Sequence, residues 1–160
     1  MIVRIFAAFA VLTILTGCAA GPKAGVAQNQ FYGPASCGCV IVPNVGDRVF
    51  FAFAGYNLSH DSVATLEKQA EWFAKQPTAN VLVAGNADER GTETYNLALG
   101  QRRADAARDE LLALGVAPTR VNTISYGKDC PVAAGHDESS WQQNRNAITS
   151  VTGFNPQSCR

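Results

Sequence analysis

The chain has 160 residues, of which 47% are hydrophobic and 16% are charged, and its formal net charge is +0. This length and composition are typical of a single globular domain preceded by a short non-globular segment. The balanced charge argues against nucleic acid or an acidic surface as an electrostatically attracted partner. We therefore expect no nucleic-acid partner.

The N-terminus has the pattern of a bacterial signal sequence. Arg4 precedes an apolar run, residues 5–15, that is too short to cross about 30 Å of hydrocarbon as a helix. The run ends in "LTGC", which resembles a lipobox, in which the cysteine becomes lipidated; an ordinary secretory signal is the alternative. Ala19, in the position after the cysteine, resembles lipoproteins sent to the outer membrane. We expect residues 1–17 to be a signal peptide and Cys18 to carry an acyl anchor, such as palmitate, at the periplasmic face of the outer membrane.

Residues 18–45 are rich in Ala, Gly, Pro, Gln and Asn and are predicted to form a flexible tether. An even number of cysteines besides Cys18 suggests two disulfides in an oxidising compartment, with three possible connectivities: Cys37, Cys39, Cys130 and Cys159. A bond between the first two is disfavoured because its ring would be strained. No histidine is spaced to complete a metal site with these cysteines, so we expect no metal and no cofactor.

Strand and helix patterns alternate from residue 46 onward. The predicted strands are 48–53, 80–85, 121–126 and 147–151, and the predicted helices follow the cap at Ser59 or Asp61, span 92–114 and span 137–144. In the long helix the expected buried stripe is Leu97, Ala104, Ala107, Leu111 and Leu114. The alternation predicts an α/β two-layer sandwich, with helices packed on a small sheet, over residues 46–152, followed by a tail at 153–160.

Polar residues after the second predicted strand indicate a ligand site. Asp88 lies on the loop that follows this strand, where functional groups are commonly placed on a rigid scaffold. On the next helix, four residues recur at i, i+3, i+4 and i+7 and should share a face apart from the buried stripe: Asn96, Leu99, Gly100 and Arg103. A glycine inside a helix costs about 1 kcal/mol relative to alanine, which suggests that something approaches the helix at Gly100.

Together, Asp88 and Arg103 have the chemistry to hold a zwitterion. The carboxylate can accept hydrogen bonds from an ammonium group, while the guanidinium donates in parallel to a carboxylate. Alternatively, the two side chains pair with each other and fix the loop, and their spacing does not choose between these readings. We expect Glu89 and Arg90 to belong to the turn and Trp141 to serve packing.

Two segments resemble the OmpA-like domain of the peptidoglycan-associated lipoproteins (Pal): "GNADERGTETYNLALGQRRADA" at 85–106 and "ISYGKDCPVAAGHDESSWQQNRNA" at 124–147. The resemblance extends over residues 46–152. It implies an α+β fold of the OmpA-like βαβαβ(α)β type, with helices packed on a mixed sheet. It also implies non-covalent, non-enzymatic binding of peptidoglycan through the diaminopimelate of its stem peptides.

By this resemblance, Asp88 matches the aspartate that holds the amine of diaminopimelate, and Arg103 matches the arginine that holds its carboxylate. Asn96 matches an asparagine of the pocket. We expect six further residues to line it: Phe53, Ala54, Ala87, Leu99, Gly100 and Arg145. Departures from the family pattern at Ala52, Ala54, Asn86 and Asn146 bear on affinity more than on ligand class.

The resemblance implies an outer-membrane lipoprotein that tethers the membrane to the cell wall, within a Tol-Pal system that serves envelope integrity and cell division. A periplasmic TolB-like β-propeller protein would be a further partner. The alternative is an OmpA-like scaffold that mainly docks envelope proteins and has weakened cell-wall binding. A hydrolase is disfavoured because Asp88 and Glu89 are adjacent and cannot readily flank one bond, and no nucleophile is visibly paired with a histidine.

Overall fold

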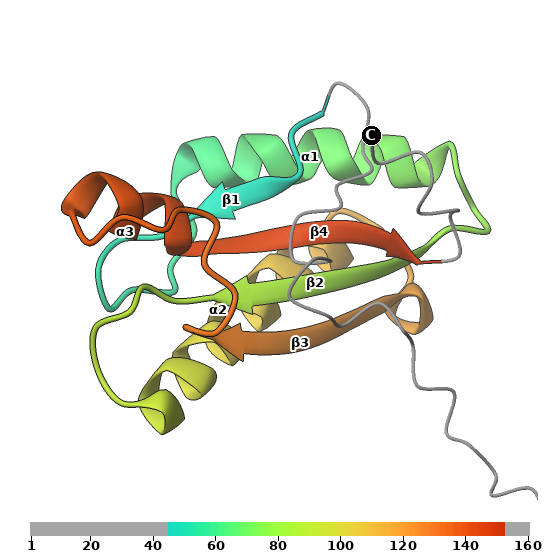
Figure 1. Cartoon of the computed structure of the whole chain (residues 1–160). Helices are drawn as coiled ribbons and strands as arrows, with labels where there is room; N and C mark the ends of the chain where they lie inside the picture. Colours follow the sequence, from blue (N-terminus) through green and yellow to red (C-terminus); the bar gives the residue numbers. More distant parts are fainter. Residues whose placement is uncertain (1–44, 153–160) are drawn as a thin grey trace, which may run out of the picture. The chain divides into compact units, whose positions relative to one another are not determined.

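The computed structural model describes residues 45–152 (Figure 1). The expected signal peptide, Cys18, nearly all of the tether, Cys37, Cys39 and Cys159 lie outside these residues, as does the C-terminal tail. The elements in chain order are β1 (Arg48–Phe50), α1 (His60–Ala74), β2 (Asn80–Asn86), α2 (Glu93–Ala113), the 3-10 helix η2 (Pro118–Arg120), β3 (Val121–Gly127), α3 (Glu138–Asn144) and β4 (Asn146–Thr152).

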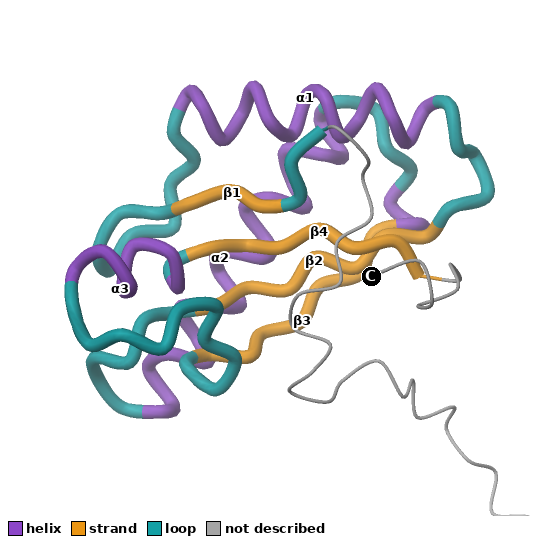
Figure 2. The backbone as a smooth tube through the Cα atoms, turned by 45° about the horizontal axis from the view of Figure 1, so that its top comes forward, coloured by secondary structure: helices purple, strands orange, loops and turns teal. Residues whose placement is uncertain are grey.

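The four strands form one mixed sheet in the order β1-β4-β2-β3. Strand β4 runs antiparallel to both of its neighbours, β1 and β2, whereas β2 and β3 are parallel. Helices α1 and α2 cover the same face of this sheet, and α3 lies beside the ends of the strands (Figures 1 and 2). The expected α+β sandwich with a mixed sheet is therefore confirmed.

The helices begin where local sequence predicts. The side chains of Ser59, Thr92 and Asp137 accept hydrogen bonds from backbone N–H groups in the first turns of α1, α2 and α3. Strand β1, in contrast, ends at Phe50, so the prediction that it continues to residue 53 is wrong. Beyond Phe50 the chain leaves the sheet and turns at residues 53–54, where Ala54 adopts a positive φ of 52°.

The buried face of α2 combines apolar and polar residues. It consists of Asn96, Leu99, Gly100, Arg103, Ala104, Ala107 and Leu111. Leu97, which was expected in the buried stripe, is 38% exposed. The prediction that the polar residues form a face separate from the buried one is therefore wrong. They lie on the same buried side of α2, toward its N-terminus, and Asn96 and Arg103 are buried with the apolar residues.

Helix α2 approaches β2 unusually closely at two glycines. A Cβ atom built on Gly85 would lie 1.9 Å from the carbonyl oxygen of Gly100, and one built on Gly100 would lie 2.8 Å from the carbonyl oxygen of Gly85. The space that Gly100 leaves is therefore filled by the adjacent strand, together with the Ser125 side chain, and not by a ligand. This close contact brings the start of α2 against the end of β2.

We predict that Gly85→Ala destabilises the fold by about 1 to 3 kcal/mol, because the added methyl group would overlap backbone atoms of α2. Chemical denaturation would measure the change. Gly55→Ala is a matched control, since its Cβ would meet its nearest atom, the Ala52 carbonyl oxygen, at 3.4 Å. Equal stability of the two variants would contradict a tight contact between helix and strand.

Candidate ligand-binding site

Four segments meet at the end of the sheet where β2 finishes: the β1–α1 loop, the β2–α2 loop, the first turns of α2, and α3 with the start of β4 (Figure 1). All of the residues predicted to contact a ligand lie on these segments. Asp88, Asn96, Arg103 and Arg145 are between 0% and 5% exposed. The fold therefore concentrates charged and polar side chains inside the protein at this end.

Asp88 is held by two arginines. Its Oδ1 accepts hydrogen bonds from the backbone N–H and Nε of Arg90, both at 3.1 Å. Its Oδ2 accepts from Nη2 of Arg90 at 2.7 Å and from Nη1 of Arg145 at 3.3 Å. Burial by itself would raise the pKa of the Asp88 carboxyl, but these hydrogen bonds outweigh it and lower the pKa below 3.8. Asp88 is therefore a carboxylate at neutral pH.

Arg103 is completely buried and donates to three backbone carbonyl oxygens: Gly55 from Nε at 2.8 Å, Asn86 from Nη1 at 2.7 Å and Ala52 from Nη2 at 3.2 Å. A guanidinium has five N–H donors, so two have no hydrogen-bond partner among the described residues. Burial lowers the pKa of Arg103 to about 10, and the charge of Asp88 opposes this shift. The guanidinium therefore stays protonated at neutral pH.

The alternative in which Asp88 and Arg103 pair with each other is wrong. Within residues 45–152, the ion pairs of Asp88 are with Arg90 and Arg145, while Arg103 takes part in none. Because the hydrogen bonds of Arg103 go to neutral carbonyl oxygens, no ion pair neutralises its positive charge, which acts on Asp88 through the field alone. The two residues are brought into one charged cluster and keep separate partners.

The other predicted residues divide into structural and surface positions. Asn96 donates to the carbonyl oxygen of Arg90 at 3.0 Å and so anchors the β2–α2 loop. Ala87, Leu99 and Gly100 are buried, and the backbone N–H of Ala87 donates to Gly127. Phe53 and Ala54 are exposed on the β1–α1 loop, with Phe53 63% exposed.

Arg145 links Asp88 to helix α3. Its Nη2 donates to Glu138 at 2.6 Å and also to Gln142, and its Nε donates to the carbonyl oxygen of Phe51 at 3.2 Å. Its side chain is only 3% exposed. Arg145 therefore fixes the position of the Asp88 carboxylate relative to α3 and the β1–α1 loop.

Sequence reasoning missed Arg90, which it assigned only to the turn. The Arg90 guanidinium lies 4.3 Å from the centre of the Phe53 ring and 4.0 Å from the centre of the Trp141 ring, while it also binds Asp88. Its Nη1 is 3.6 Å from Glu138. The signal that could have identified Arg90 is its spacing, because a residue two positions after an aspartate can return to that carboxylate through both backbone and side chain.

Glu89 and Trp141 complete the rim of the cluster. The indole Nε1 of Trp141 donates to Glu89 at 2.8 Å, and Nδ1 of His136 lies 2.7 Å from the other Glu89 oxygen. The hydrogen bond from Trp141 is the main cause of a lowered pKa for Glu89. Trp141 thus combines packing against Arg90 with a polar contact to the loop.

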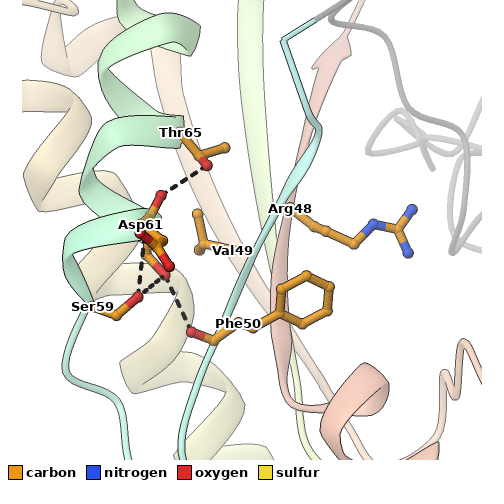
Figure 3. A pocket seen from close by; sticks show the side chains of 7 residues that line it. Arg48, Val49, Phe50, Ser59, Asp61 and Thr65 are labelled. Carbon is orange, nitrogen blue, oxygen red and sulfur yellow. Dashed lines mark hydrogen bonds between the residues drawn. The ribbon is translucent and has the colours of Figure 1, made fainter.

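A pocket of about 220 Å³ lies elsewhere, between β1 and the N-terminal half of α1 (Figure 3). Val49 of β1 faces α1, whereas the Phe50 side chain points away from it; Ser62 of α1 donates to the carbonyl oxygen of Phe50. None of the residues predicted to bind a ligand lines this pocket. Its lining does not combine buried, oppositely charged side chains as the charged cluster does.

Cys130 is in a disulfide and is 7% exposed. The other predicted half-cystines lie outside the described residues, so the pairing stays unassigned. Among residues 45–152 there is no group of His, Cys, Asp and Glu side chains suited to hold a metal ion. Nor is any helix of this segment long and apolar enough to cross a membrane.

Comparison with known families identifies the domain. A family model described as "OmpA family" matches residues 50–145, which is more than half of the chain. The chain belongs to the OmpA family. This membership agrees with the expectation that the chain is not an enzyme, and it accounts for the sheet order and helix placement seen in the structure.

Within the OmpA family, the chain is similar to lipoproteins of other bacteria. It is 53% identical over 110 residues to the peptidoglycan-associated lipoprotein of Rhizobium meliloti, covering 69% of this chain and 62% of that protein. The corresponding protein of Mesorhizobium japonicum is 51% identical, with coverages of 69% and 66%. The match thus spans less than two thirds of either relative. The Pasteurella multocida protein is 39% identical over 86% of this chain and 89% of its own length.

Solved structures agree with this family assignment. The crystal structure of the peptidoglycan-associated lipoprotein from Burkholderia pseudomallei is 40% identical, with a TM-score of 0.64 over 77% of this chain and 97% of that one. The C-terminal domain of Helicobacter pylori MotB also has a TM-score of 0.64 but is 22% identical, over 71% of this chain and 90% of that one. The second likeness therefore concerns the fold alone.

We predict that Asp88 makes stability depend on pH in the acidic range. A carboxyl whose pKa is lower in the folded state stabilises the fold above its unfolded pKa, and this contribution is lost as the pH falls through the folded pKa. Urea denaturation from about pH 6 to pH 2 should show a smaller loss of stability in Asp88→Asn than in the wild type. Parallel pH profiles for the two proteins would contradict the assigned role of the arginine contacts.

Proposed function

We propose that this chain is an outer-membrane lipoprotein that binds peptidoglycan non-covalently through the diaminopimelate of its stem peptides. The observation that carries this proposal is the charged cluster at the end of β2, in which a buried carboxylate and a buried guanidinium lie in one cluster without pairing with each other. The names of relatives at 51% and 53% identity support peptidoglycan as the target.

Each half of the ligand has a matching group. The Asp88 carboxylate would accept hydrogen bonds from the ammonium of diaminopimelate, and Arg103 would donate its two remaining N–H groups to the adjoining carboxylate. In a buried site such charge-assisted hydrogen bonds are stronger than in water. Asn96 would act indirectly, since it fixes the backbone of the loop that carries Asp88.

The proposal extends to the whole chain. Residues 1–17 would direct export, Cys18 would carry the lipid, and residues 18–45 would let the domain reach the cell wall from the outer membrane. The role would be to connect membrane and wall, with a Tol-Pal system and its β-propeller protein as the wider context in envelope integrity and cell division. The resemblance to peptidoglycan-associated lipoproteins supports this context.

The ligand assignment predicts that the full chain, purified in detergent, co-sediments with sacculi and is released by free diaminopimelate. Asp88→Asn and Arg103→Lys should each weaken binding by roughly tenfold or more, because each removes one charge-assisted or bidentate contact. Arg108→Ala is the control, since Arg108 pairs with Asp109 on the exposed side of α2.

Circular dichroism would establish that the variants are folded. Wild-type binding that persists in both site variants would refute the assigned residues. A folded wild type that does not bind sacculi would refute the proposed function and favour the scaffold role, in which the domain mainly docks envelope proteins.

The anchor predicts a separate result. Cys18→Ser should abolish incorporation of labelled palmitate and move the protein from the membrane fraction to the periplasmic fraction, because the acyl chains supply the membrane affinity. Gln28→Ala, a change in the same N-terminal segment that leaves every cysteine in place, is the control. A Cys18→Ser protein that remains in the membrane fraction would contradict lipidation at this residue.

A further inference from the structure

The strongest unexplained feature of the cluster is the position of Arg90. Its guanidinium occupies both oxygens of Asp88, at 3.1 Å from Nε to Oδ1 and 2.7 Å from Nη2 to Oδ2. These are the two atoms that the ammonium of the ligand would need. Arg145 is also bonded to Oδ2, so a ligand cation must displace a contact that the protein already makes.

The surroundings of Arg90 form a subsite for a cation. The guanidinium lies over the rings of both Phe53 and Trp141 and forms an ion pair with Asp88. Aromatic faces and a carboxylate attract any positively charged group and do not discriminate strongly between a guanidinium and an ammonium. The same three side chains could therefore hold the ammonium of a ligand.

Arg90 can leave this position more easily than the other two arginines. Its side chain is 32% exposed, compared with 3% for Arg145 and complete burial for Arg103. A second carboxylate, that of Glu138, lies 3.6 Å from Nη1 of Arg90 and is itself 64% exposed. Movement toward Glu138, which also accepts a hydrogen bond from Arg145, would keep Arg90 paired and free the two Asp88 contacts that its guanidinium makes.

We propose that Arg90 is a built-in competitor for the ammonium of the ligand, which it excludes from the subsite formed by Asp88, Phe53 and Trp141 until the ligand displaces it. This inference rests on the proposed function. It makes Arg90 a residue that limits the affinity of the site, whereas Asp88 and Arg103 provide that affinity.

The test is calorimetric titration of diaminopimelate into the full chain in detergent, with Arg90→Ala compared with the wild type. Removing the competitor should raise the affinity by on the order of tenfold, since the guanidinium makes one partly exposed ion pair and two cation–π contacts. Arg108→Ala, which removes an arginine from an ion pair outside the cluster, should leave the affinity unchanged.

A conservative variant separates competition from support of the loop. Arg90→Lys keeps a cation that can still reach Asp88, so its affinity should lie closer to that of the wild type than to that of Arg90→Ala. If Arg90 instead holds Asp88 in its binding position, Arg90→Ala would bind diaminopimelate more weakly than the wild type, which would overturn the inference.

The outcomes also distinguish this inference from the proposed function. Wild-type binding with equal or weaker binding by folded Arg90→Ala would refute the competitor and leave the function intact. If Arg90→Ala alone binds free diaminopimelate while the wild type still co-sediments with sacculi, both are supported, with the competitor dominant against the free ligand. If neither protein binds diaminopimelate or sacculi, the proposed function fails and the competitor fails with it.

Discussion

The arrangement of the site depends on one buried guanidinium. Arg103 has no exposed surface, and burying an unpaired charge is costly unless hydrogen bonds compensate. The compensation comes from three carbonyl oxygens, two in the β1–α1 loop and one at the end of β2. Because these carbonyls must converge on Arg103, the loop is folded over the sheet end and cannot extend β1.

This requirement explains the strained backbone of the loop. Ala54 adopts a positive φ of 52° although it is not a glycine, and such a conformation costs about 1 to 2 kcal/mol. The residues on either side of the turn, Ala52 and Gly55, are the ones whose carbonyl oxygens Arg103 binds. The hydrogen bonds of Arg103 thus hold a conformation that the local sequence would not favour, and they position Phe53 next to Arg90.

The sequence predicts those features that short-range physics determines. A cap at Ser59, one of the two predicted candidates, and the three predicted α-helices and four predicted strands follow from local hydrogen bonding and periodicity, and they are present. The early end of β1 and the exposure of Leu97 could not be predicted in this way, because they follow from the burial of Arg103 and Asn96. Sequence patterns that locate buried faces by their apolar residues assume that polar side chains lie at the surface. Arg103 and Asn96 are polar and buried, so the assumption fails for this helix.

The charged cluster at the end of β2 was predictable in part of its composition but not in its pairing. The positions of Asp88 after a strand and of Arg103 on a helix face were enough to select both residues. The partners of Asp88, however, depend on which guanidinium can approach it in the folded protein. Arg103 is fixed by carbonyl oxygens, whereas Arg90 and Arg145 reach Asp88 from its own loop and from the α3–β4 junction. The spacing of residues along α2 contains no information about how Arg90 or Arg145 reaches Asp88.

The resulting distribution of charge makes the two halves of the site unequal. Arg103 has donors that no described residue uses, so a ligand carboxylate would add contacts and neutralise buried positive charge. Both oxygens of Asp88 already accept hydrogen bonds, so a ligand ammonium can only exchange one cation for another. A ligand with both groups would gain binding free energy when its carboxylate binds Arg103. The bound carboxylate would then hold the ammonium at high effective concentration near Asp88, which would favour displacement of the arginine there. A simple cation would lack this advantage, so under the proposed function the site would favour a zwitterion.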